Sequence, residues 1–225
     1  MKYVTAGYEP QDVLQYFEDL ARIPRGSGNC AAVAEYVYNW GKNLGLEAWK
    51  DEYHNVILKK PGTPGCEDLP PVMLQGHLDI VAVKLPESNH NFLTDPLPLY
   101  VKDGMLRSNG TTLGADNGNA CAYMMGVLAR KDLVHPPLEC VMTSMEEVGL
   151  IGAMKMSGEH IKARTMIGMD GGGEGKFLVS SAGGCYVFLK VPFETKKAEG
   201  KALGIHIRGL LGGSRLFCRT YTPLR

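Results

Sequence analysis

The chain contains 225 residues, with 24 basic and 24 acidic side chains, and 44% of its residues are apolar. This composition is typical of a globular protein and argues against a disordered or fibrous one. A net charge of zero provides no basic field to attract phosphates, so we do not expect nucleic acid as a partner.

The sequence predicts a cytoplasmic protein with no membrane partner. Acidic and amide residues interrupt the first twenty positions, where a signal peptide would need an apolar run. Nowhere do 18 uncharged apolar residues follow one another, as a membrane-spanning helix would require.

Two amphipathic helices are expected at the start of the chain. Apolar residues recur at helical spacing over 13–23, and a second pattern of this kind runs over 29–44. Short β-rich runs follow at 48–49 and 55–58, and a loop rich in proline and glycine precedes an apolar strand at 72–75.

The middle of the chain continues this alternation. Residues 117–129 predict a helix, and 138–143 and 165–169 predict buried strands. Strands alternating with helices predict an α/β fold with helices on both faces of the sheet. The chain then becomes richer in glycine and β-like runs. We therefore expect a first domain over 1–182 and the beginning of a second over 183–225.

Three of the predicted strands are followed by acidic residues or histidine. The first leads to His77 and Asp79, the second to Glu146 and Glu147, and the third to Asp170. Because the carboxyl ends of neighbouring parallel strands lie along one edge of a sheet, these side chains could converge there. One imidazole among several carboxylates suits a zinc or manganese ion, and Asp79 could orient the imidazole.

Each candidate residue also has an ordinary structural explanation. Asp116, a further acid directly before a predicted helix, would usually be an N-cap. His77 could be a buried histidine with satisfied hydrogen bonds, Glu146 and Glu147 the start of a solvated loop, and Asp170 a turn residue. Taken alone, each of these explanations is the stronger one. Because three separate strands end in this way, the spacing leaves a metal site and the structural explanations evenly balanced.

Longer motifs then favour the metal site. They are ARIPRGSGN at 21–29, GHLD at 76–79, GTTLGADNG at 110–118, MEEVGLIGA at 145–153 and MDGGGEG at 169–175, followed by SSAGG. In order and separation they resemble the motifs of the aminoacylase/carboxypeptidase clan of dizinc peptidases, most closely the aminoacyl-histidine dipeptidases. The resemblance extends from about Pro10 to Gly213.

The resemblance implies a metal centre with two zinc ions, for which manganese or cobalt could substitute. His77 and Asp170 would bind one ion, Glu147 would bind the other, and Asp116 would bridge the two. It also implies a cis peptide bond after Asp116, and a mixed sheet into which an α+β lid domain is inserted.

The resemblance further implies hydrolysis of Xaa-His-type dipeptides. Glu146 would be the general base that takes a proton from water and passes it to the leaving amine, while Asp79 would hold His77 in place. Aminopeptidase, deacylase or carboxypeptidase activity at the same site is an alternative. A nucleotide-binding domain is a weaker one, because the glycine-rich run 171–175 lacks the lysine of a P-loop.

The chain departs from this family near its end. Relatives continue through the lid and supply further histidines, whereas residues 214–225 lose all likeness to them. We expect a frameshift or gene-model error after Gly213, with a genuine carboxy terminus as the alternative. A truncated chain keeps three ligands for one ion and two for the other, which predicts one tightly bound metal and reduced or no activity. A non-catalytic metal-binding remnant is thus a further alternative, while a full-length form would be a homodimer.

Overall fold

The computed structural model describes residues 2–171, 175–180, 190–192 and 194. Met1–Asp170 form one compact unit, which holds every helix and strand given below, and Gly171–Arg225 form a second. The predicted boundary after residue 182 and the tail 214–225 lie outside the described residues, as does nearly all of the predicted lid. The lid and the homodimer of a full-length form therefore stay predictions.

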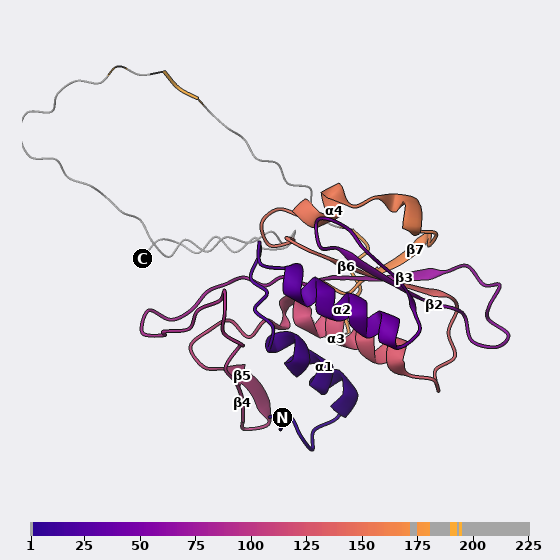
Figure 1. The fold of residues 1–225 in the computed structure, drawn as a ribbon, viewed down its shortest axis with the longest axis horizontal. Coiled ribbons are helices and arrows are strands. Elements are labelled where there is room, and N and C mark those ends of the chain that lie inside the picture. The colour runs from indigo at the N-terminus through magenta and orange to yellow at the C-terminus, as the bar shows by residue number, and fades with distance from the viewer. Residues whose placement is uncertain (1, 172–174, 181–189, 193, 195–225) are drawn as a thin grey trace, which may run out of the picture. The chain divides into compact units, whose positions relative to one another are not determined.

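A five-stranded mixed sheet lies at the centre of the first unit (Figure 1). In spatial order its strands are β1 (Glu47–Lys50), β2 (Val56–Lys60), β6 (Leu138–Thr143), β3 (Val72–His77) and β7 (Thr165–Gly168). β3 pairs in parallel with both β6 and β7, whereas β2 pairs antiparallel with β1 and β6. The carboxyl ends of β3, β6 and β7 therefore share one edge of the sheet.

Three helices lie on one side of this sheet (Figure 1). They are α1 (Gln11–Ala21), α2 (Ala31–Asn43) and α3 (Ala115–Ala129). Helices α2 and α3 contact the strands, and α1 packs against α3. Alternate strand residues such as Leu58, Cys140 and Met142 belong to the apolar core beneath them, as period-two alternation requires. No helix in the described part of the chain is long and apolar enough to cross a bilayer.

The other face carries a smaller apolar cluster. Ile57, Met73 and Val141 point to this side and contact residues of the segment that contains α4 (Ile151–Lys155) and the 3₁₀ helix η1 (Gly158–His160). Met156 and Ile161 of that segment pack against them. Helical segments thus cover both faces, which confirms the predicted α/β architecture with a mixed sheet.

A two-stranded hairpin lies outside the central sheet and was not expected. It consists of β4 (Leu99–Lys102) and β5 (Met105–Ser108), paired antiparallel. Both residues of its turn, Asp103 and Gly104, have positive φ values, of 55° and 70°. An Asp-Gly pair is a strong signal for such a turn, so the sequence did contain the information needed to predict this hairpin.

Helix α3 lies close against β3 because Gly76 has no side chain. A Cβ atom at this position would lie 2.5 Å from Asn117 Oδ1 and 2.9 Å from the Ala120 Cβ. We expect Gly76→Ala to destabilise the protein by about 1–3 kcal/mol, the usual cost of an overpacked core. Urea unfolding monitored by circular dichroism would measure the change. Gly158→Ala is the matched control, since a Cβ there meets nothing within 4 Å; equal stability of both variants would contradict the prediction.

Candidate metal centre

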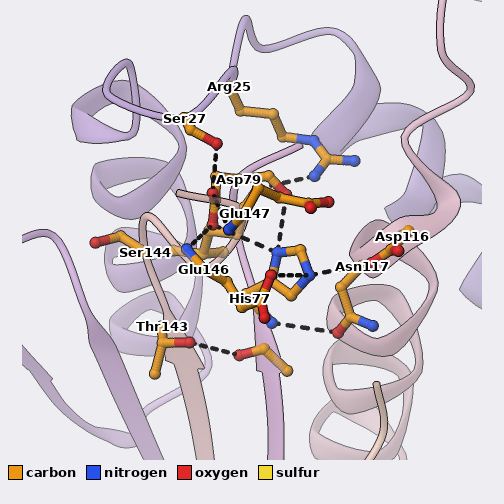
Figure 2. A network of polar contacts seen from close by, with 12 residues as sticks. Arg25, Ser27, His77, Asp79, Asp116, Asn117, Thr143, Ser144, Glu146 and Glu147 are labelled. Carbon is orange, nitrogen blue, oxygen red and sulfur yellow. Dashed lines mark hydrogen bonds and ion pairs between the residues drawn. The ribbon is translucent and has the colours of Figure 1, made fainter. Parts of the chain in front are cut away.

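Four chain segments bring the predicted site residues together. His77 is the last residue of β3, Asp116 lies in the first turn of α3, and Glu146 and Asp170 follow β6 and β7. The His77 Nε2 atom lies 3.1 Å from Asp116 Oδ1, 3.7 Å from Glu146 Oε2 and 3.8 Å from Asp170 Oδ2. The structure therefore gathers these side chains around one imidazole nitrogen. Figure 2 shows His77, Asp116 and Glu146 in this arrangement.

The turn after β6 places Glu146 and Glu147 at the site. Met145 has a positive φ of 50°, and its carbonyl accepts a hydrogen bond from the Ile151 backbone N–H at 3.1 Å. The Asn55 side chain accepts a further bond, from the Ser144 N–H at 3.0 Å, and so ties the turn to the segment before β2. The backbone geometry of the turn and the buried Asn55 side chain thus fix the main-chain positions of Glu146 and Glu147.

Asp116 is presented by an irregular start of α3. Gly114 adopts a left-handed conformation with a φ of 72°, and Asp116 and Asn117 depart from helical backbone angles. The Asp116–Asn117 peptide bond is cis, as the family resemblance implied. The side chain of Asp116 is 72% exposed, so that it faces solvent as well as His77.

Asp79 contacts the site through both its main chain and its carboxylate. Its main-chain oxygen lies 3.0 Å from His77 Nδ1, and its carboxylate oxygen Oδ1 lies 3.4 Å from the same atom. The carboxylate also accepts hydrogen bonds from the backbone N–H groups of Glu146, at 3.0 Å, and Glu147, at 3.3 Å (Figure 2). Asp79 therefore contacts both the imidazole and the turn that bears the two glutamates.

Two residues to which the sequence analysis gave no role complete these contacts. The Ser27 hydroxyl donates to Asp79 Oδ2 at 2.7 Å. Asn117 accepts a bond from the His77 N–H at 3.2 Å and donates one to Asp170 Oδ1 at 3.1 Å. Both residues lie inside the recognised motifs, but their partners are 52 and 40 positions away along the chain. Local patterns therefore could not reveal these contacts.

The carboxylates shift the ionisation of the site in a consistent direction. Although burial lowers the pKa of His77, the hydrogen bond and charge of Asp79 and the charges of Asp170 and Glu146 raise it to about 9. Burial acts to raise the pKa of Asp79, but hydrogen bonds from His77, Ser27 and the Glu146 N–H lower it to about 2.

The pKa values of Glu146, Glu147 and Asp170 are raised. For Glu146, burial and the charges of Asp170, Asp79 and Asp116 raise the pKa against the opposing effect of His77. Burial likewise raises the pKa of Glu147 and of Asp170. These shifts are those of an anionic cluster that a cation would stabilise.

The donor set fits a divalent transition metal. Two groups of three ligand atoms each lie within 4.8 Å of one another: His77 with Asp116 and Asp170, and His77 with Glu146 and Glu147. One imidazole with carboxylate oxygens suits zinc, manganese or cobalt, and does not by itself choose among them. Both groups use His77, so the described residues supply one histidine to the whole centre.

Comparisons with known proteins find similar peptidases. Over 206 residues, 91% of this chain, the sequence is 35% identical to the cytosol non-specific dipeptidase of Escherichia coli (strain K12), and the match covers 42% of that protein. The solved structure of the aminoacylhistidine dipeptidase from Vibrio alginolyticus superimposes with a TM-score of 0.74 and 34% identity, over 77% of this chain and 35% of that one. A tripeptidase from Staphylococcus aureus matches with a TM-score of 0.62 and 27% identity, over 72% of this chain and 44% of that one. No family model matches the chain.

The fold is similar to that of these solved peptidases, and the donor set could hold a metal ion, which agrees with the class of protein that the motifs had indicated. The chain is a homologue of the Escherichia coli cytosol non-specific dipeptidase. It spans about two fifths of that relative's length.

Proposed function

We propose that this chain carries the metal-binding catalytic centre of a dipeptidase and takes zinc. The observation that supports the proposal most directly is the approach of Asp116, Glu146 and Asp170 to within 3.1–3.8 Å of His77 Nε2 in a homologue of dipeptidases. His77, Asp116 and Asp170 would hold one ion, and Glu147 with Asp116 would contribute to a second.

In the proposed mechanism, Glu146 is the general base. When bound, the metal would lower the pKa of water and polarise the scissile carbonyl. Glu146 accepts the proton as the water oxygen attacks the carbonyl carbon, then donates it to the nitrogen as the C–N bond breaks. The raised pKa of Glu146 supports this role, because a base must hold the proton between the two steps. Asp79 would keep both His77 and Glu146 in place through the bonds described above.

A cavity of about 350 Å³ beside the site is where we propose that the substrate enters. Asp116 and Glu147 line it, and Ile80, Val81 and Leu113 contribute apolar surface. Its size suits a short peptide rather than a protein chain. The name of the Escherichia coli relative places that protein in the cytosol, and we propose the same compartment for this chain.

A second candidate function is metal binding without catalysis. The observation that favours it is the single histidine shared by both groups of ligand atoms, since one Nε2 atom binds one ion. A site that binds one ion and has an incomplete set of ligands for the second would retain the first metal ion and lose most of the rate of dipeptide hydrolysis.

Hydrolysis assays on three substrates would separate these functions. We expect the purified 225-residue chain to cleave an Xaa-His dipeptide slowly and to leave a tripeptide and an N-acyl amino acid intact. We also expect a chelator to stop the cleavage and added Zn²⁺ to restore it. Metal binding without any hydrolysis would favour the second candidate, and hydrolysis that a chelator does not affect would contradict both.

A further inference from the structure

Arg25 is a buried cation beside the metal centre. The residue is 2% exposed. Its guanidinium donates one hydrogen bond from Nη1 to the carbonyl of Leu78, at 2.8 Å, and another from Nη2 to the carbonyl of Gly114, at 2.7 Å. Leu78 directly follows His77, and Gly114 lies two residues before Asp116. One rigid planar group therefore joins the two segments that present these ligands.

The backbone around Arg25 is fastened to the same segment. The Ile80 N–H donates to the Arg25 carbonyl at 3.1 Å, and the Ser27 N–H donates to the Ile80 carbonyl at 3.3 Å. Gly26 and Ile80 form an isolated parallel bridge. The main chain that carries Arg25 is thus fastened to the segment just after His77 and Asp79.

The start of α3 is shaped to receive the guanidinium. A Cβ atom on Gly118 would lie 2.4 Å from Arg25 Nη2, and one on Gly114 would lie 3.0 Å from it. These two glycines flank Asp116 and Asn117 on both sides along the chain. The Arg25 guanidinium therefore lies close to the backbone both before and after Asp116.

No carboxylate of the described residues lies within ion-pair distance of Arg25, and its Nε atom has no hydrogen-bond partner among them. A buried cation without a direct counter-ion is costly, which indicates that something else compensates for it. Burial lowers the pKa of Arg25, and the charge of Asp79, which contacts His77, acts in the opposite direction.

We propose that Arg25 is a positioning residue for the metal centre. It sets the separation between the segment that carries His77 and the turn that carries Asp116. This inference rests on the proposed metal site and adds a residue that binds no metal itself.

Metal affinity of the purified chain, measured by titration with Zn²⁺ and by the visible absorption of bound Co²⁺, tests the proposal. Arg25→Lys keeps the positive charge but removes the planar group that donates to the Leu78 and Gly114 carbonyls at the same time. We expect a loss of about 10- to 100-fold in affinity, the range found when a group that orients metal ligands is removed, together with an altered Co²⁺ spectrum. The matched control is Glu18→Gln, which weakens another buried cluster of hydrogen bonds, to Val4 and Thr5. It should lower stability and leave the affinity and the spectrum unchanged.

Gly118→Ala provides an independent test that leaves Arg25 in the chain. The added methyl group displaces the guanidinium, so we expect the same direction of change in affinity and spectrum. Gly126→Ala in the same helix is its control, since a Cβ there meets only a methyl group of Val13, at 3.0 Å. Wild-type affinity and spectrum in both Arg25→Lys and Gly118→Ala would overturn the role of Arg25 alone. A wild-type chain that binds no metal would overturn the metal centre, and the role of Arg25 with it.

Discussion

The wild-type chain should bind one zinc ion tightly, and His77→Ala should lower its affinity by more than about 100-fold, the upper end of the loss caused by removing an orienting neighbour. The reason is that both groups of ligand atoms in the described residues depend on His77. Removing the imidazole leaves carboxylates that repel one another and offer no nitrogen ligand. Isothermal titration with Zn²⁺ after treatment with a chelator would give both the stoichiometry and the affinity.

His160→Ala is the matched control for this experiment. His160 lies in η1, stacks on Trp49 and pairs with Glu159, and none of these residues belongs to the candidate centre. Its replacement should leave zinc binding unchanged. Binding of two ions by the wild-type chain with equal affinity would contradict the ligand count. Wild-type affinity in His77→Ala would contradict the site itself.

Glu146→Gln should lower the rate of dipeptide hydrolysis by about 10²–10⁴-fold, which is the usual contribution of general acid–base catalysis. Glutamine has nearly the same shape, but it does not accept the proton from water. We expect zinc affinity to stay within a few-fold of wild type, because the proposed ligands are intact. Steady-state kinetics at saturating Zn²⁺, with parallel zinc titration, would separate the two effects.

The structure makes this experiment informative, because Glu146 Oε2 lies 3.7 Å from His77 Nε2 and belongs to one of the two groups of ligand atoms. Asp170→Asn serves as the comparison and should weaken zinc binding strongly. If Glu146→Gln weakened zinc binding as much as Asp170→Asn does, Glu146 would be a ligand and not the base. Glu159→Gln, an exposed change outside the centre, should alter neither quantity.

Much of the fold could be predicted from hydrophobic periodicity. The apolar runs at 72–75 and 138–143 correspond to β3 and β6, and the first two helical patterns correspond to α1 and α2. The antiparallel insertion of β2 beside β6 could not be predicted in this way, because pairing between distant strands leaves no local trace. The hairpin of β4 and β5 is a different case. Its strands have only four residues each, and only the Asp-Gly pair of its turn indicated a hairpin.

The predicted site residues converge because parallel strands end at one edge of the sheet. The motif spacing indicated which acids follow β3, β6 and β7, and the structure brings His77, Asp116, Glu146 and Asp170 together. The roles of Arg25 and Asn117 were beyond the reach of the sequence. Arg25 contacts residues 53 and 89 positions away, and these contacts exist only after the chain has folded.

The order of strands in the sheet has a consequence for folding while the chain is being synthesised on the ribosome. β2 and β3 are neighbours in sequence, yet they do not pair with each other; β6 lies between them and pairs with both. The central strand, β6, is therefore synthesised about 60 residues after β3. Until β6 has been made, the core side chains of α1 and α2 have no completed sheet to pack against. Such non-local pairing is slow to form and leaves apolar surface open meanwhile. The sheet between β2 and β3 therefore cannot be completed before residue 143 has been synthesised.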